Sequence, residues 1–422
     1  MPAYYSTGNQ TTTSRKEAMN TETTTDAASA EELRARMVDK VRAKGFATNS
    51  RVEQALRDMP RHDFVPEHDL ETAYHPFQAV ITHRFADGTS LSCASAPFVV
   101  AMMLDQLDVR PGDRVLEIGA GTGYNAALLA ELTGDSQLVT TIDVDEDVTE
   151  QARRNLDSAG YGDVRVVIGD GTDGVPEHGP YDRIIATVSP WEIPPAWWQQ
   201  LTPGGRMVLP LRWRGQTRSI AFAEQDGKLV SDSVELCGFV NLTGDTEGEQ
   251  TGAITEDGTV NLHWDRDQPV TPEDLRGVLD TPSTTRWSGH TLGGSEPFDG
   301  IWLRLTAEDD RTCRINVHPD VSRDVAAPIE HMRAPALVQG ASLAYVTHQR
   351  TETENGPRWE LGAIGHGPDA ETLADRLIEV LGLWSEARDA RPTVTAYPVD
   401  TDPPEASIEK RHSKLLVIYS EE

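Results

Sequence analysis

The sequence of 422 residues is short of cysteine and of long apolar runs, and each shortage excludes a class of protein. Its three cysteines, Cys93, Cys237 and Cys313, are too few and too scattered for a disulfide framework. No run of roughly 18 apolar residues could cross a bilayer, and no apolar N-terminal stretch precedes a small-residue cleavage site. We therefore expect a soluble protein of the reducing cytoplasm, with no membrane partner.

Basic residues are also scarce, since 38 Lys and Arg stand against 68 Asp and Glu, for a formal net charge of −30. Such a surface repels phosphate backbones, which normally demand a basic patch, so nucleic acid is not expected as a partner. A salt-adapted source would explain the acidity equally well, because net charge bears on solubility more than on fold. The 12 His and the three Cys show no metal-ligand spacing, so we expect no metal site.

The length predicts two folded domains after a disordered tail. Residues 1–29 are rich in Thr, Ser, Asn and Ala and form the tail, 30–240 the first domain and 245–422 an α+β second domain. Residues 244–258 are rich in Gly, Thr and Glu and predict a linker or mobile loop. Near the start, helices are expected over 31–44 and after Ser50, whose spacing to Glu53 suits a capping box.

From residue 114 the pattern alternates between strand and helix, which predicts an α/β, Rossmann-like domain with a parallel sheet. We expect strands at 115–118, 138–142, 164–168, 181–187 and 205–211, helices at 124–132, 148–159 and 194–201, and a turn at 203–205. In the second domain we expect strands at 260–264, 301–305, 343–347, 359–364 and 415–419, and helices at 272–279 and 370–383.

A glycine-rich turn is the sharpest local signal. Residues 115–124 read Val-Leu-Glu-Ile-Gly-Ala-Gly-Thr-Gly-Tyr. Gly119, Gly121 and Gly123, with Thr122 among them, would let the backbone after a strand approach a ligand closely. An ordinary tight turn would show the same glycines, so the surrounding residues must distinguish a ligand-binding turn from a purely structural one.

Asp143 ends the next expected strand, where an acidic side chain accepts hydrogen bonds from ribose hydroxyls. NAD is disfavoured, because the glycines recur every second residue and because Glu117 beside the turn would repel a pyrophosphate. A cationic sulfonium cofactor, S-adenosylmethionine, fits better. After the third strand, Asp170 and Gly171 could contact the adenine, or Asp170 could serve only the turn.

Further strings resemble the protein-L-isoaspartate O-methyltransferase family over nearly half of the chain. They are residues 61–67 (Arg-His-Asp-Phe-Val-Pro-Glu), 95–97 (Ser-Ala-Pro), 169–171 (Gly-Asp-Gly), 180–185 (Pro-Tyr-Asp-Arg-Ile-Ile) and 200–210 (Gln-Leu-Thr-Pro-Gly-Gly-Arg-Met-Val-Leu-Pro). The resemblance implies an S-adenosylmethionine-dependent carboxyl O-methyltransferase in which Ser95 holds the substrate carboxylate. Ser95 could alternatively cap the following helix.

On the substrate side the sequence departs from repair enzymes of that family, which usually carry Ala-Tyr-x-Asp-x-Pro and Gly-Gln-Thr-Ile-Ser. Here the first loop continues Tyr74, His75, Pro76, and the second run reads Leu-Ser-Cys-Ala-Ser over 91–95. Tyr74, His75, Ser95 and Ala96 are the expected substrate-binding residues. Such changes are expected if this protein uses the same methyl donor as the repair enzymes but a different methyl acceptor.

The long C-terminal part is the second departure. Residues 236–240 (Leu-Cys-Gly-Phe-Val) and 408–417 (Ile-Glu-Lys-Arg-His-Ser-Lys-Leu-Leu-Val) are similar to a longer branch of the family. That branch occurs in gene clusters for ribosomally made peptides of graspetide, lanthipeptide or imiditide type, where it methylates an Asp of a precursor peptide and the ester closes to aspartimide.

That resemblance leaves three hypotheses open: a precursor-peptide methyltransferase, a repair enzyme with an appended module, and a cofactor-sensing protein without turnover. Arg212, Arg214 and Arg218 could pair with acidic substrate groups or form a solvated basic face. The sequence carries no signal for an oligomeric state.

Overall fold

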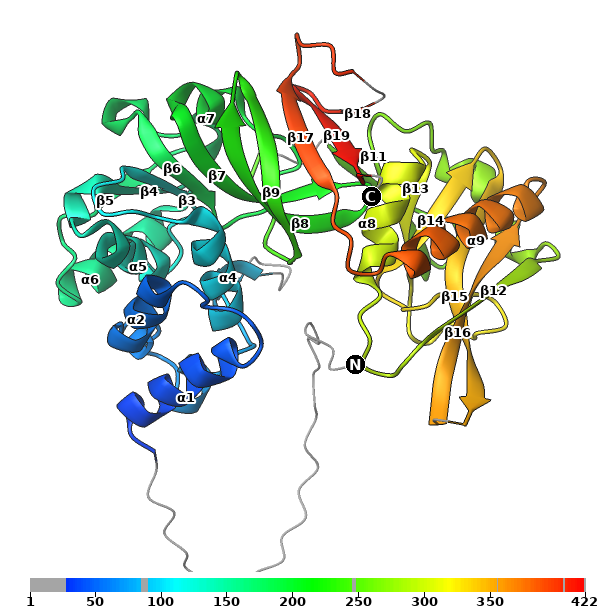
Figure 1. Cartoon of the computed structure of the whole chain (residues 1–422), viewed down its shortest axis with the longest axis horizontal. Coiled ribbons are helices and arrows are strands. Elements are labelled where there is room, and N and C mark those ends of the chain that lie inside the picture. Colours follow the sequence, from blue (N-terminus) through cyan, green and yellow to red (C-terminus); the bar gives the residue numbers. More distant parts are fainter. Residues whose placement is uncertain (1–27, 85–89, 245–247, 355, 405–406, 421–422) are drawn as a thin grey trace, which may run out of the picture. The chain divides into compact units, whose positions relative to one another are not determined.

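The computed structural model describes residues 28–84, 90–244, 248–354, 356–404 and 407–420 in two compact units (Figure 1). The first unit combines Met1–Asp113 with Ala120–Ile168, and the second combines Arg114–Gly119 with Gly169–Glu422. The predicted tail lies outside the described residues except for Ala28 and Ser29. Among the described residues, no helix has both the length and the apolar character needed to cross a bilayer.

Short helices and a hairpin open the first unit. They are α1 (Ala30–Arg42), α2 (Ser50–Asp58), η1 (Arg61–Phe64), α3 (Leu70–Ala73), the antiparallel strands β1 (Val80–Arg84) and β2 (Ser90–Ala94), and α4 (Pro97–Leu107). The capping box predicted at Ser50 is wrong, because Asn49 precedes the helix and its side chain accepts a hydrogen bond from Arg51 N. A true capping box joins Ser29 and Glu32 at the start of α1.

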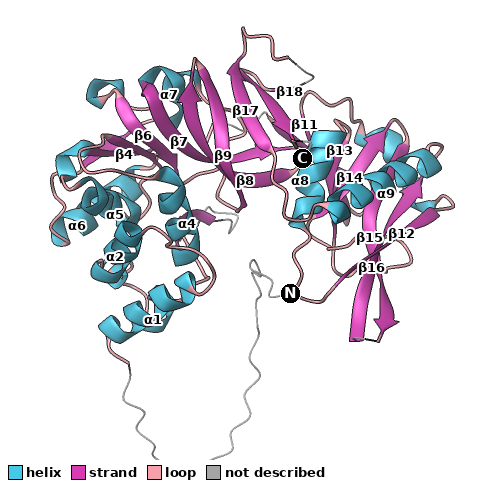
Figure 2. Ribbon diagram, viewed as in Figure 1, coloured by secondary structure: helices cyan, strands magenta, loops and turns pink. Residues whose placement is uncertain are grey.

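The predicted βαβ pattern of the first unit is confirmed. Its elements are α5 (Tyr124–Thr133), η2 (Ser136–Leu138), β4 (Val139–Asp143), α6 (Glu146–Ser158) and β5 (Arg165–Ile168), and Figure 2 shows the helices beside the strands. β4 and β5 pair in parallel, with Asp143 opposite Ile168 at their carboxyl ends.

The second unit builds its first sheet from β3 (Val115–Ile118), β6 (Tyr181–Ala186), β7 (Leu201–Trp213), β8 (Gln216–Gln225) and β9 (Lys228–Leu236). β3, β6 and β7 pair in parallel, and β7, β8 and β9 form antiparallel hairpins. Between β5 and β7 lie η3 (Gly171–Asp173), η4 (Pro176–His178) and α7 (Pro195–Gln200). The turn predicted at 203–205 is wrong, since these residues lie inside β7 as a shift in its register with β6.

The end of the chain returns to this sheet. β17 (Thr393–Pro398) pairs with β9 and with β19 (Ser413–Ile418), which pairs with β18 (Ile408–Glu409), and Figure 1 shows β17 beside β9. The strand order in this unit is therefore β18-β19-β17-β9-β8-β7-β6-β3. Residues 393–418 thus share a sheet with the predicted first domain, in contrast to the boundaries expected from the sequence.

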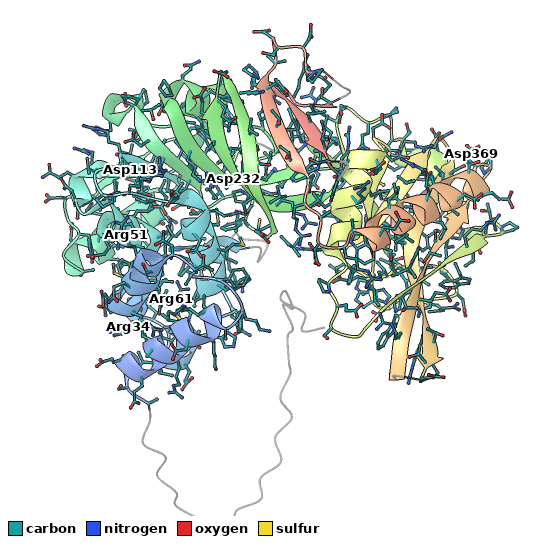
Figure 3. All side chains as sticks on the ribbon, in the orientation of Figure 1. Arg34, Arg51, Arg61, Asp113, Asp232 and Asp369 are labelled. Carbon is teal, nitrogen blue, oxygen red and sulfur yellow. The ribbon has the colours of Figure 1, made fainter. Side chains whose placement is uncertain are left out.

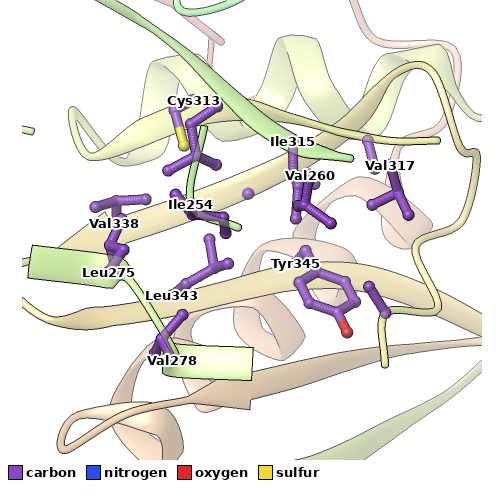
Figure 4. Close-up of a cluster of buried hydrophobic side chains, with 14 of the residues drawn as sticks. Ile254, Val260, Leu275, Val278, Cys313, Ile315, Val317, Val338, Leu343 and Tyr345 are labelled. Carbon is purple, nitrogen blue, oxygen red and sulfur yellow. The ribbon is translucent and has the colours of Figure 1, made fainter. Parts of the chain in front are cut away.

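A second sheet fills the rest of this unit, in the order β10-β11-β13-β14-β15-β16-β12. The strands are β10 (Glu249–Ala253), β11 (Val260–Asp265), β12 (Thr284–Leu292), β13 (Thr312–Val317), β14 (Ala334–Gln339), β15 (Ser342–Thr353) and β16 (Gly356–His366). One apolar cluster, drawn in Figure 4, joins β11, β13 and β14 to η5 (Pro272–Leu275) and η6 (Val278–Asp280). The other packs α8 (Asp299–Glu308) and α9 (Ala370–Glu386) on the sheet.

Three expectations for this part are wrong. The predicted linker 244–258 contains β10, although residues 245–247 lie outside the described residues. The predicted strand 301–305 is α8, because Ile301 and Leu305, four residues apart, face one apolar cluster. The predicted helix 272–279 is the two short 3-10 turns η5 and η6.

Candidate functional site

The glycine turn and Asp143 meet within the first unit. Gly121 and Gly123 have positive φ angles of 52° and 83°, a conformation that L side chains rarely adopt. Asp143 Oδ2 accepts a hydrogen bond from Gly121 N at 3.3 Å, and its Oδ1 accepts one from Asp145 N at 3.3 Å. The carboxylate is half-buried, and burial raises its pKa above the usual value for Asp.

Apolar side chains flank that carboxylate. Val144 follows Asp143 directly and is 48% exposed, and Ile168 lies opposite Asp143 on β5 and is 56% exposed. An acceptor for hydroxyl groups close to two exposed apolar residues suits a nucleoside, with ribose on the carboxylate and a base on the apolar surface. Sequence reasoning missed both residues, although their places at the strand ends could have signalled them.

The segment that carries Ser95 lies against the glycine turn. A Cβ on Gly121 would be 3.5 Å from Cys93 O and 3.9 Å from Ser92 Oγ, so β2 ends beside the turn. Asn155 on α6 donates from Nδ2 to Thr122 O at 2.9 Å and to Phe64 O at 3.4 Å. The family-like string at 61–67 and the turn are thereby held together, a link that the sequence did not reveal.

Ser95 itself is half-buried and is held by its backbone. Arg61 Nη2 donates to Ser95 O at 2.8 Å and to Ala94 O at 3.1 Å. The N-cap of α4 is Ala96, and no side chain caps this helix. The alternative role of Ser95 as a helix cap is therefore wrong.

The two loop residues expected to bind substrate differ in exposure. Tyr74 is buried, its hydroxyl lies 2.7 Å from His62 Nδ1, and burial raises the pKa of this phenol. His75 is half-buried, its Nδ1 accepts from Phe77 N at 3.3 Å, and burial lowers the pKa of the imidazole. The loop reaches the start of α4 through the hydrogen bond from Phe98 N to Pro76 O, and so lies near Ala96.

In the second unit, glycines permit close packing around the end of β3. Thr187 Oγ1 donates to Gly119 O at 2.7 Å, and a Cβ on Gly119 would be 2.6 Å from that hydroxyl. A Cβ on Gly171 would be 2.7 Å from Ile118 Cγ2. Glu117 is fully buried in β3. The chain after β3 can therefore pack this closely only because positions 119 and 171 are glycine.

Asp170 is exposed and caps a turn. Its Oδ1 accepts hydrogen bonds from Thr172 N at 2.9 Å and from Thr172 Oγ1 at 2.8 Å. The turn-forming role considered for Asp170 is thus present in the structure.

The three arginines expected to face substrate or solvent are buried instead. Arg212 Nη1 lies 3.3 Å from Glu249 Oε2, Arg214 Nη1 2.6 Å from Asp267 Oδ1, and Arg218 Nη1 2.6 Å from Asp299 Oδ2. Their exposed fractions are 6%, 3% and 2%. Both expectations for this cluster are wrong, because acidic partners distant in sequence neutralise it within the unit.

The chain was compared with protein families, with curated proteins and with solved structures. The family model described as Protein-L-isoaspartate(D-aspartate) O-methyltransferase matches residues 32–247. The protein-L-isoaspartate O-methyltransferase of Hyperthermus butylicus is 40% identical over 223 residues, covering 51% of this chain and 90% of the relative. That of Methanopyrus kandleri is 39% identical over 219 residues, covering 51% and 93%. A solved structure titled protein-L-isoaspartate O-methyltransferase aligns at a TM-score of 0.49 and 21% identity, over 90% of this chain and 98% of its own.

Proposed function

Since this chain belongs to the protein-L-isoaspartate(D-aspartate) O-methyltransferase family, we propose that it methylates the side-chain carboxylate of an Asp in a ribosomally made precursor peptide. The chain is an S-adenosylmethionine-dependent carboxyl O-methyltransferase, and its cofactor is S-adenosylmethionine. Its fold is the Rossmann-like one of class I methyltransferases, with an added C-terminal sheet. We propose three further points: the peptide substrate, the residues of the site, and a role of residues 245–422 in recognising the peptide.

The residues of the first unit fit the cofactor. Asp143 would accept from the ribose hydroxyls, and Val144 and Ile168 would face the adenine. Gly121, Thr122 and Gly123 form a turn that leaves the backbone open to a ligand. The assignment of Glu117, Gly119, Asp170 and Gly171 to the cofactor rests on the sequence pattern. When bound, the cofactor supplies an electrophilic methyl group on a sulfonium sulfur.

Ser95 is proposed to hold the acceptor. A substrate carboxylate has a pKa of about 4 and is an ionised nucleophile at neutral pH, so no general base has to activate it. The Ser95 hydroxyl would donate to one carboxylate oxygen and leave the other to attack. The main contribution of the protein is then to position the reactants, with Ala96, Tyr74 and His75 shaping the acceptor side.

One observation carries the precursor-peptide proposal: the relatives align over 90% and 93% of their own length with only 51% of this chain. The part of the chain beyond the aligned region is folded, with a seven-stranded sheet, two helices and two buried apolar clusters. Binding energy from peptide remote to the reacting carboxylate could select one Asp among many.

The ester prepares the second step. The backbone nitrogen after the methylated Asp attacks the ester carbonyl, the C–N bond forms, and the nitrogen's proton leaves with the methoxide as methanol. The product is a five-membered aspartimide, which closes readily because the two groups are adjacent. Hydrolysis of the ring gives isoaspartate, so the enzyme itself need only make the ester.

Methylation of defined peptides tests the proposal. The purified chain is incubated with methyl-labelled S-adenosylmethionine and either a precursor peptide encoded beside it, the same peptide with its Asp changed to Asn, or a generic isoaspartyl peptide. We expect labelled methyl from the precursor only, counted as base-labile ester plus the methanol released on ring closure, and none from its Asn form. Efficient labelling of the isoaspartyl peptide with none on the precursor would establish the repair function instead. A Ser95→Ala variant that binds cofactor but transfers no methyl would exclude a purely cofactor-sensing role.

A further inference from the structure

Arg61 opens one of the strings that resemble the family, residues 61–67, yet the proposed function gives it no role. It opens the 3-10 turn η1, and its side chain is 0% exposed. Figure 3 shows Arg61 among the helices at the start of the chain, with Arg34 and Arg51 also labelled.

Its guanidinium joins three separate segments of the first unit. Nε donates to Ala73 O at 2.9 Å, in the loop that continues to Tyr74 and His75. Nη2 donates to the carbonyls on both sides of the Ala94–Ser95 bond, as described above. The guanidinium carbon lies 4.8 Å from the ring centroid of Tyr124, the residue that follows the glycine turn. One side chain thus connects the acceptor loop, the Ser95 backbone and the start of α5.

The charge of Arg61 has no acidic partner in the described part of the chain. The groups with the largest electrostatic effects on it are Tyr124, Cys93 and Tyr74, which are neutral at neutral pH. Its Nη1 is buried and meets no hydrogen-bond acceptor among the described residues. A guanidinium remains protonated even when buried, so a positive charge without a counter-ion lies directly behind Ser95.

We propose that Arg61 is a positioning residue that fixes the Ser95 backbone and supplies the positive charge by which the site prefers an ionised carboxylate to a neutral amide or ester. This inference rests on the proposed function. The carboxylate gains from the charge, whereas the methyl ester formed from it does not. The same charge that attracts the substrate therefore favours release of the product.

A charge of this kind acts mainly on substrate binding. The negative charge of the carboxylate diminishes as the ester forms, so the attraction is stronger in the bound substrate than in the transition state. Removing the charge should raise KM for the carboxylate substrate while kcat changes little. A merely structural role would lower the folded fraction or affect binding of acid and amide peptides alike.

Cys93 serves as a reporter that needs no substrate. Burial raises the pKa of its thiol, and the positive charge of Arg61 opposes that shift. Besides Arg61, the groups around this pair are Ser95, Tyr124, Tyr74 and, on α1, Arg34. Burial raises the pKa of Cys237 and Cys313 to about 12, so they should react far more slowly with an alkylating reagent.

The test compares Arg61→Gln, which keeps donors for the carbonyls without the charge, with Arg61→Lys, which keeps the charge. Arg51→Met is the matched control, because Arg51 also donates to backbone carbonyls of this unit, those of Val109 and Leu132. We expect iodoacetamide to alkylate Cys93 at pH 8 at least threefold more slowly in Arg61→Gln, with near-wild-type rates in Arg61→Lys and Arg51→Met. Equal rates in Arg61→Gln and the wild type would overturn the proposal. Should Arg61→Gln not fold, as judged by circular dichroism, the pH profile of alkylation in the wild type decides: a midpoint for Cys93 below those of Cys237 and Cys313 would support the proposal, and a midpoint as high as theirs would overturn it.

Steady-state kinetics and competition with peptides give a second test of the proposal. Using the peptide that the wild type methylates, we expect Arg61→Gln to raise KM at least tenfold with kcat within threefold, and to lose the preference for that peptide over its Asn counterpart as competitor. An unchanged preference would overturn the proposal. If the wild type methylates no peptide but the Cys93 result holds, the proposed function fails while the charge behind Ser95 stands.

Discussion

Asp143 is the side chain on which we expect cofactor binding to depend most. It accepts hydrogen bonds from two backbone N–H groups, and its neighbours Val144 and Ile168 are exposed and apolar. Asp143→Ala should weaken S-adenosylhomocysteine binding by about 1–3 kcal/mol, through loss of ribose hydrogen bonds. Titration calorimetry measures this directly. Asp135→Ala, which removes a cap from η2 in the same unit, should leave the affinity unchanged.

The raised pKa of Asp143 predicts a pH dependence of cofactor affinity. Only the ionised carboxylate accepts from both ribose hydroxyls, so affinity should be constant above this pKa and fall as the pH drops through it. Binding then stabilises the ionised form and releases a proton in that range. Calorimetry in buffers of different ionisation enthalpy would detect the released proton. Asp143→Asn should abolish the pH dependence, and its persistence there would contradict this explanation.

At the level of single residues, the sequence predicted candidate site residues but not the side chains that support them. The glycines, Asp143 and Ser95 could be proposed because their expected chemistry follows from residue type and local order. Arg61 and Asn155 were missed because their roles depend on backbone carbonyls contributed by distant segments. The pairing of Arg212, Arg214 and Arg218 with acids up to 81 residues away was equally invisible.

Among the elements, the βαβ part was predictable and the C-terminal part was not. Strands such as β3 and β4 are short apolar runs between turn residues, which local pattern identifies. The run at 301–305 has the same composition but forms α8, since short apolar runs fit either structure until packing decides. The pairing of β17 with β9 joins residues more than 150 apart, and no local pattern encodes it.

Lys410 links the C-terminal strands to the rest of the second unit. Its Nζ donates to Arg212 O at 3.0 Å, lies 3.4 Å from Asp265 Oδ2 and sits 3.8 Å from the ring centroid of Trp191. Lys410→Met would leave the buried Asp265 with Arg214 Nη1, at 3.8 Å, as its cationic partner, and should lower the free energy of unfolding by roughly 1–3 kcal/mol. Lys414→Met is the matched control, since its partner Asp402 is fully exposed. Equal denaturation midpoints for the two variants would show that Lys410 is not a stabilising link.

For the whole molecule, the net charge of −30 is the dominant electrostatic feature. Like charges on a compact chain repel, and salt screens them, with a Debye length of about 10 Å at 0.1 M and about 3 Å at 1 M. We therefore expect the Tm to rise by several degrees between 0.05 M and 1 M KCl, as followed by circular dichroism. A falling Tm would mean that paired charges, such as Arg206 with Asp232, outweigh the repulsion.

The most direct test of the central claim is a crystal structure of the chain with bound S-adenosylhomocysteine. We expect the ligand to lie against the turn at Gly121–Gly123, with its ribose hydroxyls on Asp143 and its adenine beside Val144 and Ile168. A ligand bound elsewhere, with this turn unoccupied and Asp143 facing solvent, would contradict it.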